Sequence, residues 1–225
     1  MFRIARAAAF AAVALFAARA AAQSADAGLL AQAVATTQNA KIDYAFDFDL
    51  DTSKQNWRAR FDPDMSPKLR LLAPRREDLP GDARQAFDRM ASAMEGVSWC
   101  ASETIAHVGN VQLLSENAES ATYAFQPTPE SIRGEQAGRF AARLRGEMTI
   151  TKIAPDITRV RLYAPEAFDP FPLVRVDHVN IVITCATAPN GRRYGAQTVT
   201  DLRGSALGQR FNEHSVQRTR NLTAS

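Results

Sequence analysis

The stretch KIDYAFDFDLD, residues 41–51, decides the fold class of this chain. Apolar and mostly acidic side chains alternate along it: Ile42, Tyr44, Phe46, Phe48 and Leu50 against Asp43, Ala45, Asp47, Asp49 and Asp51. A period of two residues is typical of a β-strand that has one buried face and one face in water. The stretch therefore predicts an antiparallel sheet whose inner face covers an apolar core.

The same alternation resumes after a polar break at residues 51–54. Trp57, Ala59 and Phe61 fall on one side of the second segment, and Arg58 and Arg60 fall on the other. The two segments predict a hairpin whose outer face sets Asp against Arg. Exposed cross-strand ion pairs stabilise by only about 0.2–1 kcal/mol each. The buried aromatic side chains should therefore dominate the stability of this hairpin.

A helix of about 14 residues is predicted from Asp82, which can act as its N-cap. Ala83, Phe87, Met90 and Met94 recur at helical spacing and give it one apolar face. Further helices are expected over residues 29–37 and 131–144, although Gly134 and Gly138 weaken the latter.

The remaining apolar segments predict strands at residues 108–114, 121–125, 148–153, 157–163, 174–186 and 192–202. The last two flank Ala188-Pro189-Asn190-Gly191, a strong turn signal. Within residues 174–186 the apolar phase slips at Asp177-His178, which predicts a β-bulge. Gly204-Ser205-Ala206-Leu207-Gly208 has serine in the second place of a nucleophile elbow and not in the third, so a turn or bulge is expected there.

Residues 23–225 contain no linker and are expected to form a single β-rich domain. We expect an α+β fold in which a strongly curved antiparallel sheet, or partial barrel, of about 8–10 strands packs on one or two helices. A flat open sheet of that size would leave its edges unprotected.

Residues 1–22 predict a cleavable secretory signal peptide. Arg3 and Arg6 precede the apolar run 7–18, and Ala20-Ala21-Ala22 forms a cleavage site, with Ala25-Asp26-Ala27 as the alternative. The apolar run is shorter than the roughly 20 residues that cross a bilayer, and no transmembrane anchor is expected. The mature protein should be periplasmic or secreted.

Removal of the signal peptide cancels the net charge of +3, because Arg3, Arg6 and Arg19 account for all of it. No nucleic-acid partner is expected from a neutral chain. Residues 23–130 nevertheless carry 10 bases and 16 acids, and residues 131–225 carry 14 bases and 8 acids. The favoured interpretation is that the two halves pair within one sheet; the alternative is a basic surface that attracts an acidic partner.

Cys100 and Cys185 are the only cysteines, and an exported chain with two cysteines predicts a disulfide. The alternative makes Cys100 a nucleophile with His107 as its base.

Three further patterns give weaker indications of a metal or ligand site. His107, His178 and His214 lack zinc-ligand spacing, and Asp47, Asp49 and Asp51 open a calcium loop that has Thr52 where glycine is required. The densest basic region comprises Arg192, Arg193, Arg203, Arg210, Arg218 and Arg220, with Tyr194 among them; it is interpreted as a solvated face, with phosphate or lipid headgroups as the alternative ligands.

The apolar face of the first hairpin and the methionine-bearing helix together suggest a cavity between sheet and helix. The sequence therefore favours a non-enzymatic carrier or binding protein for an apolar or amphipathic ligand, such as a lipid or a lipoprotein acyl chain. No cofactor is expected. The candidate ligand-binding residues are Tyr44, Phe46, Phe48, Trp57, Phe61, Phe87, Met90 and Met94. An exported hydrolase whose site is assembled only in the fold, and an envelope protein-interaction module, are the alternatives.

Overall fold

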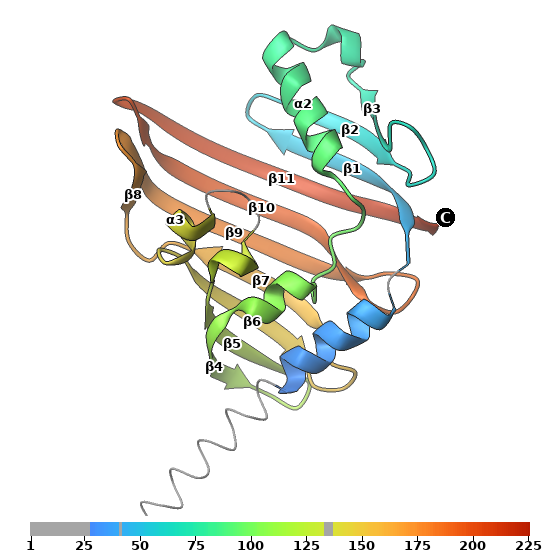
Figure 1. Cartoon of the computed structure of the whole chain (residues 1–225), viewed down its shortest axis with the longest axis vertical. Coiled ribbons are helices and arrows are strands. Elements are labelled where there is room, and N and C mark those ends of the chain that lie inside the picture. The colour runs from blue at the N-terminus through green and yellow to red at the C-terminus, as the bar shows by residue number, and fades with distance from the viewer. Residues whose placement is uncertain (1–27, 41, 133–136) are drawn as a thin grey trace, which may run out of the picture.

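The computed structural model describes residues 28–40, 42–132 and 137–225. A single sheet of 11 strands dominates it (Figure 1). The strands are β1 (Tyr44–Thr52), β2 (Asn56–Phe61), β3 (Leu69–Ala73), β4 (Gly109–Glu116), β5 (Ser120–Gln126), β6 (Arg145–Thr151), β7 (Ile157–Tyr163), β8 (Phe168–Phe171), β9 (Val174–Thr187), β10 (Arg193–Ala206) and β11 (Gln209–Ala224). Three short helices accompany them, at residues 28–39, α2 (Gly81–Ala93) and α3 (Ala137–Ala141). Three 3-10 turns, η1 (Arg76–Asp78), η2 (Glu103–His107) and η3 (Pro129–Ser131), lie between them.

The strand order is β3-β2-β1-β11-β10-β9-β7-β6-β5-β4, with β8 paired to β9 beside this path, and every pairing is antiparallel. Strands β3 and β4 stand at the two ends, so the sheet is not closed into a barrel. The first and last of the described strands, β1 and β11, lie side by side in the interior of the sheet (Figure 1).

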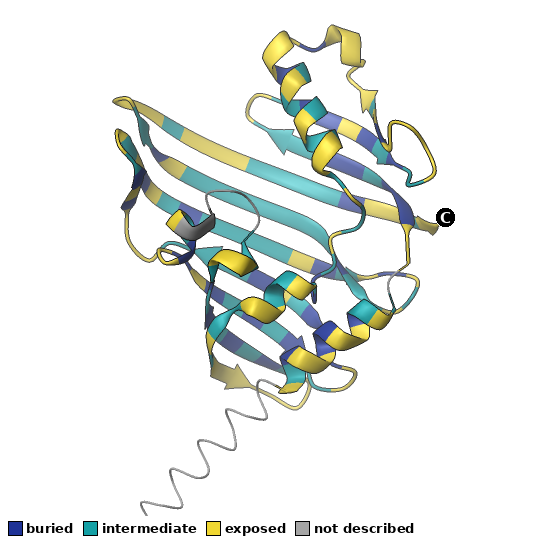
Figure 2. Cartoon of the chain, in the orientation of Figure 1, coloured by how far each residue is buried: buried dark blue, intermediate teal, exposed yellow. Residues whose placement is uncertain are grey.

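The helices gather on one face of this sheet and leave part of it uncovered. Helix α2 lies over β1–β3, and the N-terminal helix, η2 and α3 lie over the β4–β9 end (Figure 1). Between these two groups no helix covers the long strands β10 and β11, and the central residues of these strands are only half-buried (Figure 2). The two largest apolar cores therefore lie under these two groups of helices, and smaller apolar clusters form around Phe168 and around Tyr194.

Each core is built from the alternation that the sequence shows. Phe46, Phe48, Trp57 and Phe61 of the first hairpin pack against Phe87 of α2, where the Trp57 and Phe87 rings meet edge to face at 5.5 Å. The second core joins the N-terminal helix to the inner faces of β5, β6, β7 and β9. Burial of a large apolar side chain stabilises by about 1.5–3 kcal/mol, so these two clusters hold the helices in place.

Most of the predicted elements are confirmed. The hairpin of residues 42–61, the helix beginning near residue 29, the strands from residue 108 onward and the turn at 188–191 are all present. The pairing of β10 with β9 shifts register beside Asp177, which confirms the predicted bulge. The predicted signal peptide, residues 1–22, lies outside the described residues.

Three expectations about individual elements need correction. The sheet has 11 strands, because β3, β8 and β11 were not predicted. Asp82 lies inside α2, and Pro80 is the N-cap residue. Within the described part of residues 131–144, only the end of η3 and the five-residue α3 are helical. The structure is therefore sheet-dominated and only weakly α+β.

Candidate ligand-binding site

A cavity of about 600 Å³ lies where α2 meets the uncovered part of the sheet. Its walls come from the inner face of β1, the last turn of α2 and residues 94–104, which comprise the connection after α2 and the start of η2 and are called the connection 94–104 below. The large apolar side chains in these walls are Ile42, Phe46, Phe48, Met90, Met94, Val97 and Trp99. A volume of this size falls within the range of small-molecule sites.

The floor of the cavity is polar. Gln217 and Thr219 of β11 lie on it, and they stand opposite Leu50 and Phe48 of β1 in the register of the sheet. On the same face, Gln217 pairs with Thr198 and Ser215 pairs with Thr200 of β10. We call these residues (Thr198, Thr200, Ser215, Gln217 and Thr219) the polar strip. It continues the cavity floor along the bare stretch of β10 and β11 and offers hydroxyl and amide groups for hydrogen bonding.

The ionisable side chains that line the cavity are all acidic. Asp43, Glu95 and Glu103 stand at its rim, exposed to solvent, and among the residues that the structure describes no Lys, Arg or His lines it. None of the three carboxylates forms an ion pair within the described residues. The cavity therefore combines apolar walls, a polar floor and a negatively charged rim.

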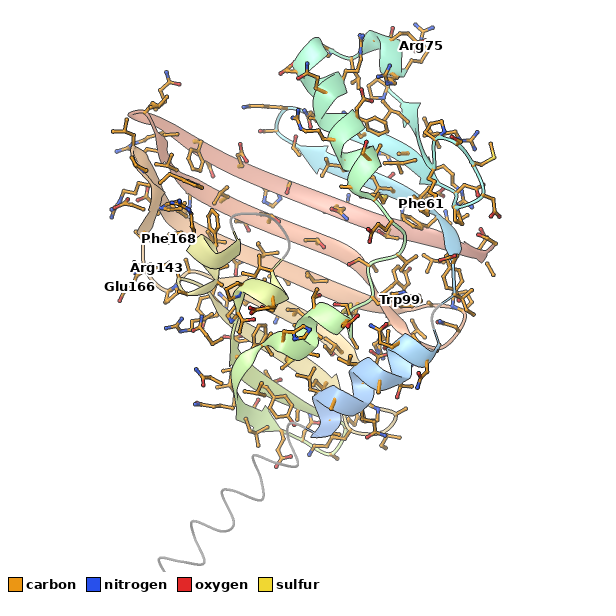
Figure 3. The ribbon with its side chains drawn as sticks, in the orientation of Figure 1. Phe61, Arg75, Trp99, Arg143, Glu166 and Phe168 are labelled. Atoms are coloured by element: carbon orange, nitrogen blue, oxygen red, sulfur yellow. A yellow bond between two sulfur atoms is a disulfide. The ribbon has the colours of Figure 1, made fainter. Side chains whose placement is uncertain are left out.

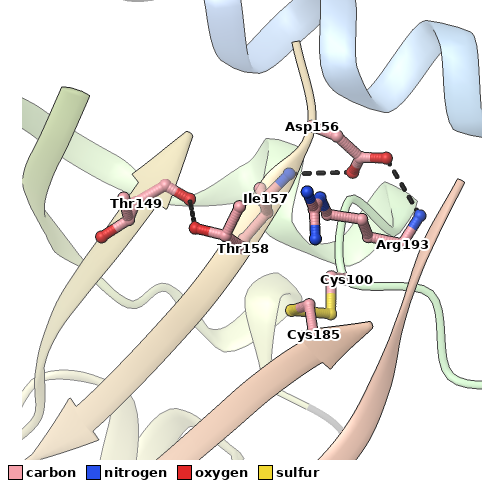
Figure 4. The surroundings of a disulfide bond; sticks show 7 residues. All are labelled: Cys100, Thr149, Asp156, Ile157, Thr158, Cys185 and Arg193. Carbon is pink, nitrogen blue, oxygen red and sulfur yellow. Dashed lines mark hydrogen bonds between the residues drawn. A yellow bond between two sulfur atoms is a disulfide. The ribbon is translucent and has the colours of Figure 1, made fainter. Parts of the chain in front are cut away.

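The connection 94–104 is fixed to the sheet at several points. Trp99 (labelled in Figure 3) forms an isolated bridge with Tyr194, and its ring meets that of Tyr44 edge to face at 6.1 Å. The Gly195 amide donates to the Ser98 carbonyl at 2.8 Å. The predicted disulfide between Cys100 and Cys185 is present and confirmed (Figure 4). One wall of the cavity is thus covalently attached to β9.

A buried carboxylate reinforces this attachment. Asp156 accepts hydrogen bonds from the backbone amides of Ile157, at 2.8 Å, and of Arg193, at 3.0 Å, beside the disulfide (Figure 4). Burial raises the pKa of the Asp156 carboxyl above its ordinary value, while the two amides and the guanidinium of Arg192, at 3.6 Å, act in the opposite direction. This group holds the β9–β10 turn against the start of β7.

A second, smaller cavity of about 170 Å³ lies on the other side of the connection. It shares Ser98, Trp99, Ser102 and Thr104 with the first cavity, and the rest of its wall is mostly apolar. Ile105, Val108, Phe125, Val160, Leu162 and Ile183 contribute to that wall. Residues 98–104 therefore separate a larger, partly polar space from a smaller apolar one.

The structure divides the predicted ligand-binding residues into two groups. Phe46, Phe48, Met90 and Met94 line the larger cavity. Trp57, Phe61 and Phe87 fill the core under α2 instead, and Tyr44 is buried beside Tyr194, with its hydroxyl accepting the Asn190 amide at 3.1 Å. Sequence reasoning missed Trp99, Gln217 and Thr219, which reach the site from parts of the chain with no periodic apolar signal.

The structure also bears on the catalytic and metal-binding hypotheses. Cys100 is disulfide-bonded, so the hypothesis of a Cys100 nucleophile is wrong. Asp47, Asp49 and Asp51 form ion pairs with arginines on the outer face. His214 and Asp201 are 2.7 Å apart there, but the part of the chain that the structure describes supplies no hydroxyl or thiol bonded to that ring. Across the described ranges, no three His, Cys, Asp or Glu side chains form a group that could hold a metal ion.

The arginines of the densest basic region differ in whether they form ion pairs. Arg192 pairs with Asp156, while Arg218 and Arg220 pair with Asp51 and Asp49. Arg203 and Arg210 remain exposed near the far end of β10 and β11.

Comparisons with protein-family models, with curated proteins and with solved structures find no match to this chain. Within the described residues, the structure contains no helix that has both the length and the apolar character needed to cross a membrane.

Proposed function

We propose that this protein is an exported, non-enzymatic binding protein that carries an amphipathic molecule in the cavity between α2 and the sheet. The observation that supports this most directly is the composition of the cavity wall. Aromatic and methionine side chains from β1, α2 and the connection 94–104 surround a space that ends on the polar strip. Methionine adapts its shape to varied ligands, and a few polar groups suffice to orient a molecule that has one polar end.

Export is the second part of this proposal. The charged, apolar and small-residue segments of residues 1–22 have the order of a signal peptide. Disulfides form and persist outside the reducing cytosol, so the Cys100–Cys185 pair is compatible with a periplasmic or secreted protein.

A hydrolase is less well supported by the geometry. The pair formed by His214 and Asp201 lies on the exposed outer face, away from both cavities under the helices. A general base needs a nucleophile or a positioned water within hydrogen-bonding reach. Binding therefore remains the favoured function.

Blocking the cavity tests the proposal. Ala93 and Ser92 are both exposed at the end of α2, but only Ala93 lines the cavity. N-phenyl-1-naphthylamine, an uncharged apolar fluorophore, serves as the probe because the acidic rim will not repel it. We expect saturable binding that Ala93→Trp weakens by about tenfold, a loss of about 1.4 kcal/mol, and that Ser92→Trp leaves unchanged. Equal binding by both variants, or no binding by the parent protein, would show that the cavity is not a ligand site.

A further inference from the structure

Two tight turns meet at the far end of the long strands, at the upper left of Figure 1. Pro172-Leu173 connects β8 to β9, and Leu207-Gly208 connects β10 to β11. The Leu207 amide donates to the Leu173 carbonyl at 2.9 Å, so the two turns are held side by side. We call residues 168–177 and 203–212 the distal tip.

Each turn places a leucine where its backbone geometry favours another residue. Leu173 has φ +61° and Leu207 has φ +52°, followed by Gly208 at +79°. A two-residue hairpin with positive φ at both positions normally carries Asn-Gly, and a turn with Pro first normally has Gly or Asn second. A bulky residue at positive φ is unfavourable and persists where the surroundings or a function require it.

The two leucines are also largely exposed. The exposed fraction of Leu173 is 73% and that of Leu207 is 77%. Their side chains therefore contribute little to the core that would offset the backbone cost. Two adjacent turns thus share an arrangement that presents apolar side chains to the exterior.

The distal tip, which exposes Leu173 and Leu207, also carries several arginines. Ser205 of β10 pairs with both Arg210 of β11 and Arg175 of β9, which brings the two guanidinium groups onto one face, and Arg203 follows two residues along β10. Arg139 lies over the ring of Phe171, 5.0 Å from its centre.

The acidic side chains of the distal tip are both engaged by a single arginine. Asp169 and Asp177 lie 3.5 Å and 3.0 Å from Arg175. Arg203 and Arg210 form no ion pair with any residue that the structure describes. The tip therefore keeps a local positive charge although the chain after residue 22 is neutral.

We propose that the distal tip docks on a membrane surface that contains anionic phospholipid. Leu173 and Leu207 enter the headgroup boundary, and Arg203 and Arg210 bind lipid phosphates. Two leucines on narrow turns expose too little surface for a stable protein interface, which covers about 800 Å² on each partner. Leucine and arginine side chains together match an interface that is apolar inside and negatively charged at its surface.

Vesicle sedimentation with the full chain tests this proposal. Vesicles of phosphatidylcholine alone are compared with vesicles that also contain phosphatidylglycerol, at low and high salt. We expect binding only to the anionic vesicles, and release by salt because phosphate–guanidinium attraction is screened. Each arginine near an anionic surface contributes about 1 kcal/mol, so Arg210→Gln should weaken partitioning about fivefold.

Leu173→Asn/Leu207→Asn is the decisive variant. Asparagine tolerates positive φ, so the turns should fold at least as well as in the parent protein. We expect partitioning onto anionic vesicles to fall by about tenfold or more. Ile153→Asn is the matched control, since Ile153 is 83% exposed in the β6–β7 turn, outside the distal tip, and its replacement should change nothing.

Four results would overturn the proposal. The first is no binding of the parent protein to anionic vesicles. The second is equal binding to both kinds of vesicle, and the third is equal loss in the Ile153→Asn control. If the parent protein instead self-associates in sedimentation velocity and the double leucine variant does not, the tip is a contact between copies and the lipid assignment is wrong.

Discussion

Asp49 of β1 lies between Arg58 of β2 and Arg220 of β11 and forms an ion pair with both, although only 6% of its side chain is exposed. Asp47 and Asp51 each form an ion pair with one arginine, Arg60 and Arg218 respectively. The acidic N-terminal half of the chain and its basic C-terminal half therefore meet along the β1–β11 pairing. The Asp49–Arg220 and Asp51–Arg218 pairs support the interpretation that part of the charge asymmetry is satisfied within the sheet.

Asp49→Asn should destabilise the fold by about 1–2 kcal/mol, because two arginines lose the charge between them. The effect stays below that of a fully buried pair, since both guanidinium groups are half exposed and can reach water. Asp51→Asn is the control: its carboxylate is more exposed, and the loss should be below about 1 kcal/mol. Urea unfolding monitored by tryptophan fluorescence measures both. Equal losses in the two variants would mean that the buried position of Asp49 between two arginines adds no stability.

Asn221→Gly should remove a pH-dependent part of the stability. The Asn221 amide donates to the Asp47 carboxylate at 2.7 Å, and this hydrogen bond is the main cause that lowers the pKa of Asp47 below its ordinary value, with Arg60 adding to it. A carboxyl with a lowered pKa in the folded state adds stability above its unfolded pKa, near 3.9, and loses it as the pH falls through the folded value.

At neutral pH we expect Asn221→Gly to cost about 0.5–1 kcal/mol, because the bond is to a charged group that is still partly exposed. Glycine is the replacement because Asn221 has φ +55°. The difference from the parent protein should vanish in acid, apart from a pH-independent backbone contribution. NMR titration of Asp47 should show its pKa rising toward the ordinary value. A stability difference that stays constant from acid to neutral pH would contradict this role.

Gly146→Ala should destabilise the β5–β6 pair strongly. A Cβ atom at this position would stand 2.1 Å from Cζ of the Phe125 ring, which covers the glycine and is itself buried. Overpacking of this kind costs about 1–3 kcal/mol, which would lower the melting temperature by several degrees. Gly109→Ala, whose Cβ would meet nothing nearer than 3.8 Å, is the control. Phe125→Leu in the Gly146→Ala background should recover part of the loss; a purely additive double variant would argue against the clash.

Removal of the disulfide by Cys100→Ala/Cys185→Ala should reduce the free energy of unfolding by about 2–5 kcal/mol, because the bond links residues 85 positions apart. The same change releases one wall of the larger cavity from β9, so N-phenyl-1-naphthylamine should bind more weakly. Both effects should be reproduced by reductant acting on the parent protein. Unchanged unfolding in reductant would mean that the bond contributes nothing.

Local pattern explains which elements were predictable. The β1–β2 hairpin was found because large apolar side chains alternate on two neighbouring segments, and Phe46 does face Phe61 across it. The bulge at Asp177 was found because the apolar phase slips there. Strand β11 was missed because neither of its faces is apolar: one carries part of the polar strip, and the other pairs its arginines with the aspartates of β1.

The site was half predictable for a related reason. Phe46, Phe48, Met90 and Met94 lie on amphipathic elements, and their periodicity points inward. Trp99 lies on an irregular connection, and Gln217 lies on a strand with no apolar signal. Trp99 is placed by contacts with Tyr44 and Tyr194, and Gln217 by its pairing with Leu50; these partners are distant in the sequence, and local pattern does not encode them.

The pairing of β1 with β11 also sets the order in which the chain can be completed. Tyr44 of β1 pairs with Ala224 of β11, so β1 cannot complete its pairing until β11 has been made. While the polypeptide emerges stepwise from a ribosome or a translocation channel, β1 and β10 both present unsatisfied edges to the surroundings. Contacts of such long range slow folding. Until β11 has paired, these edges of a newly made copy are therefore open to pairing with other chains.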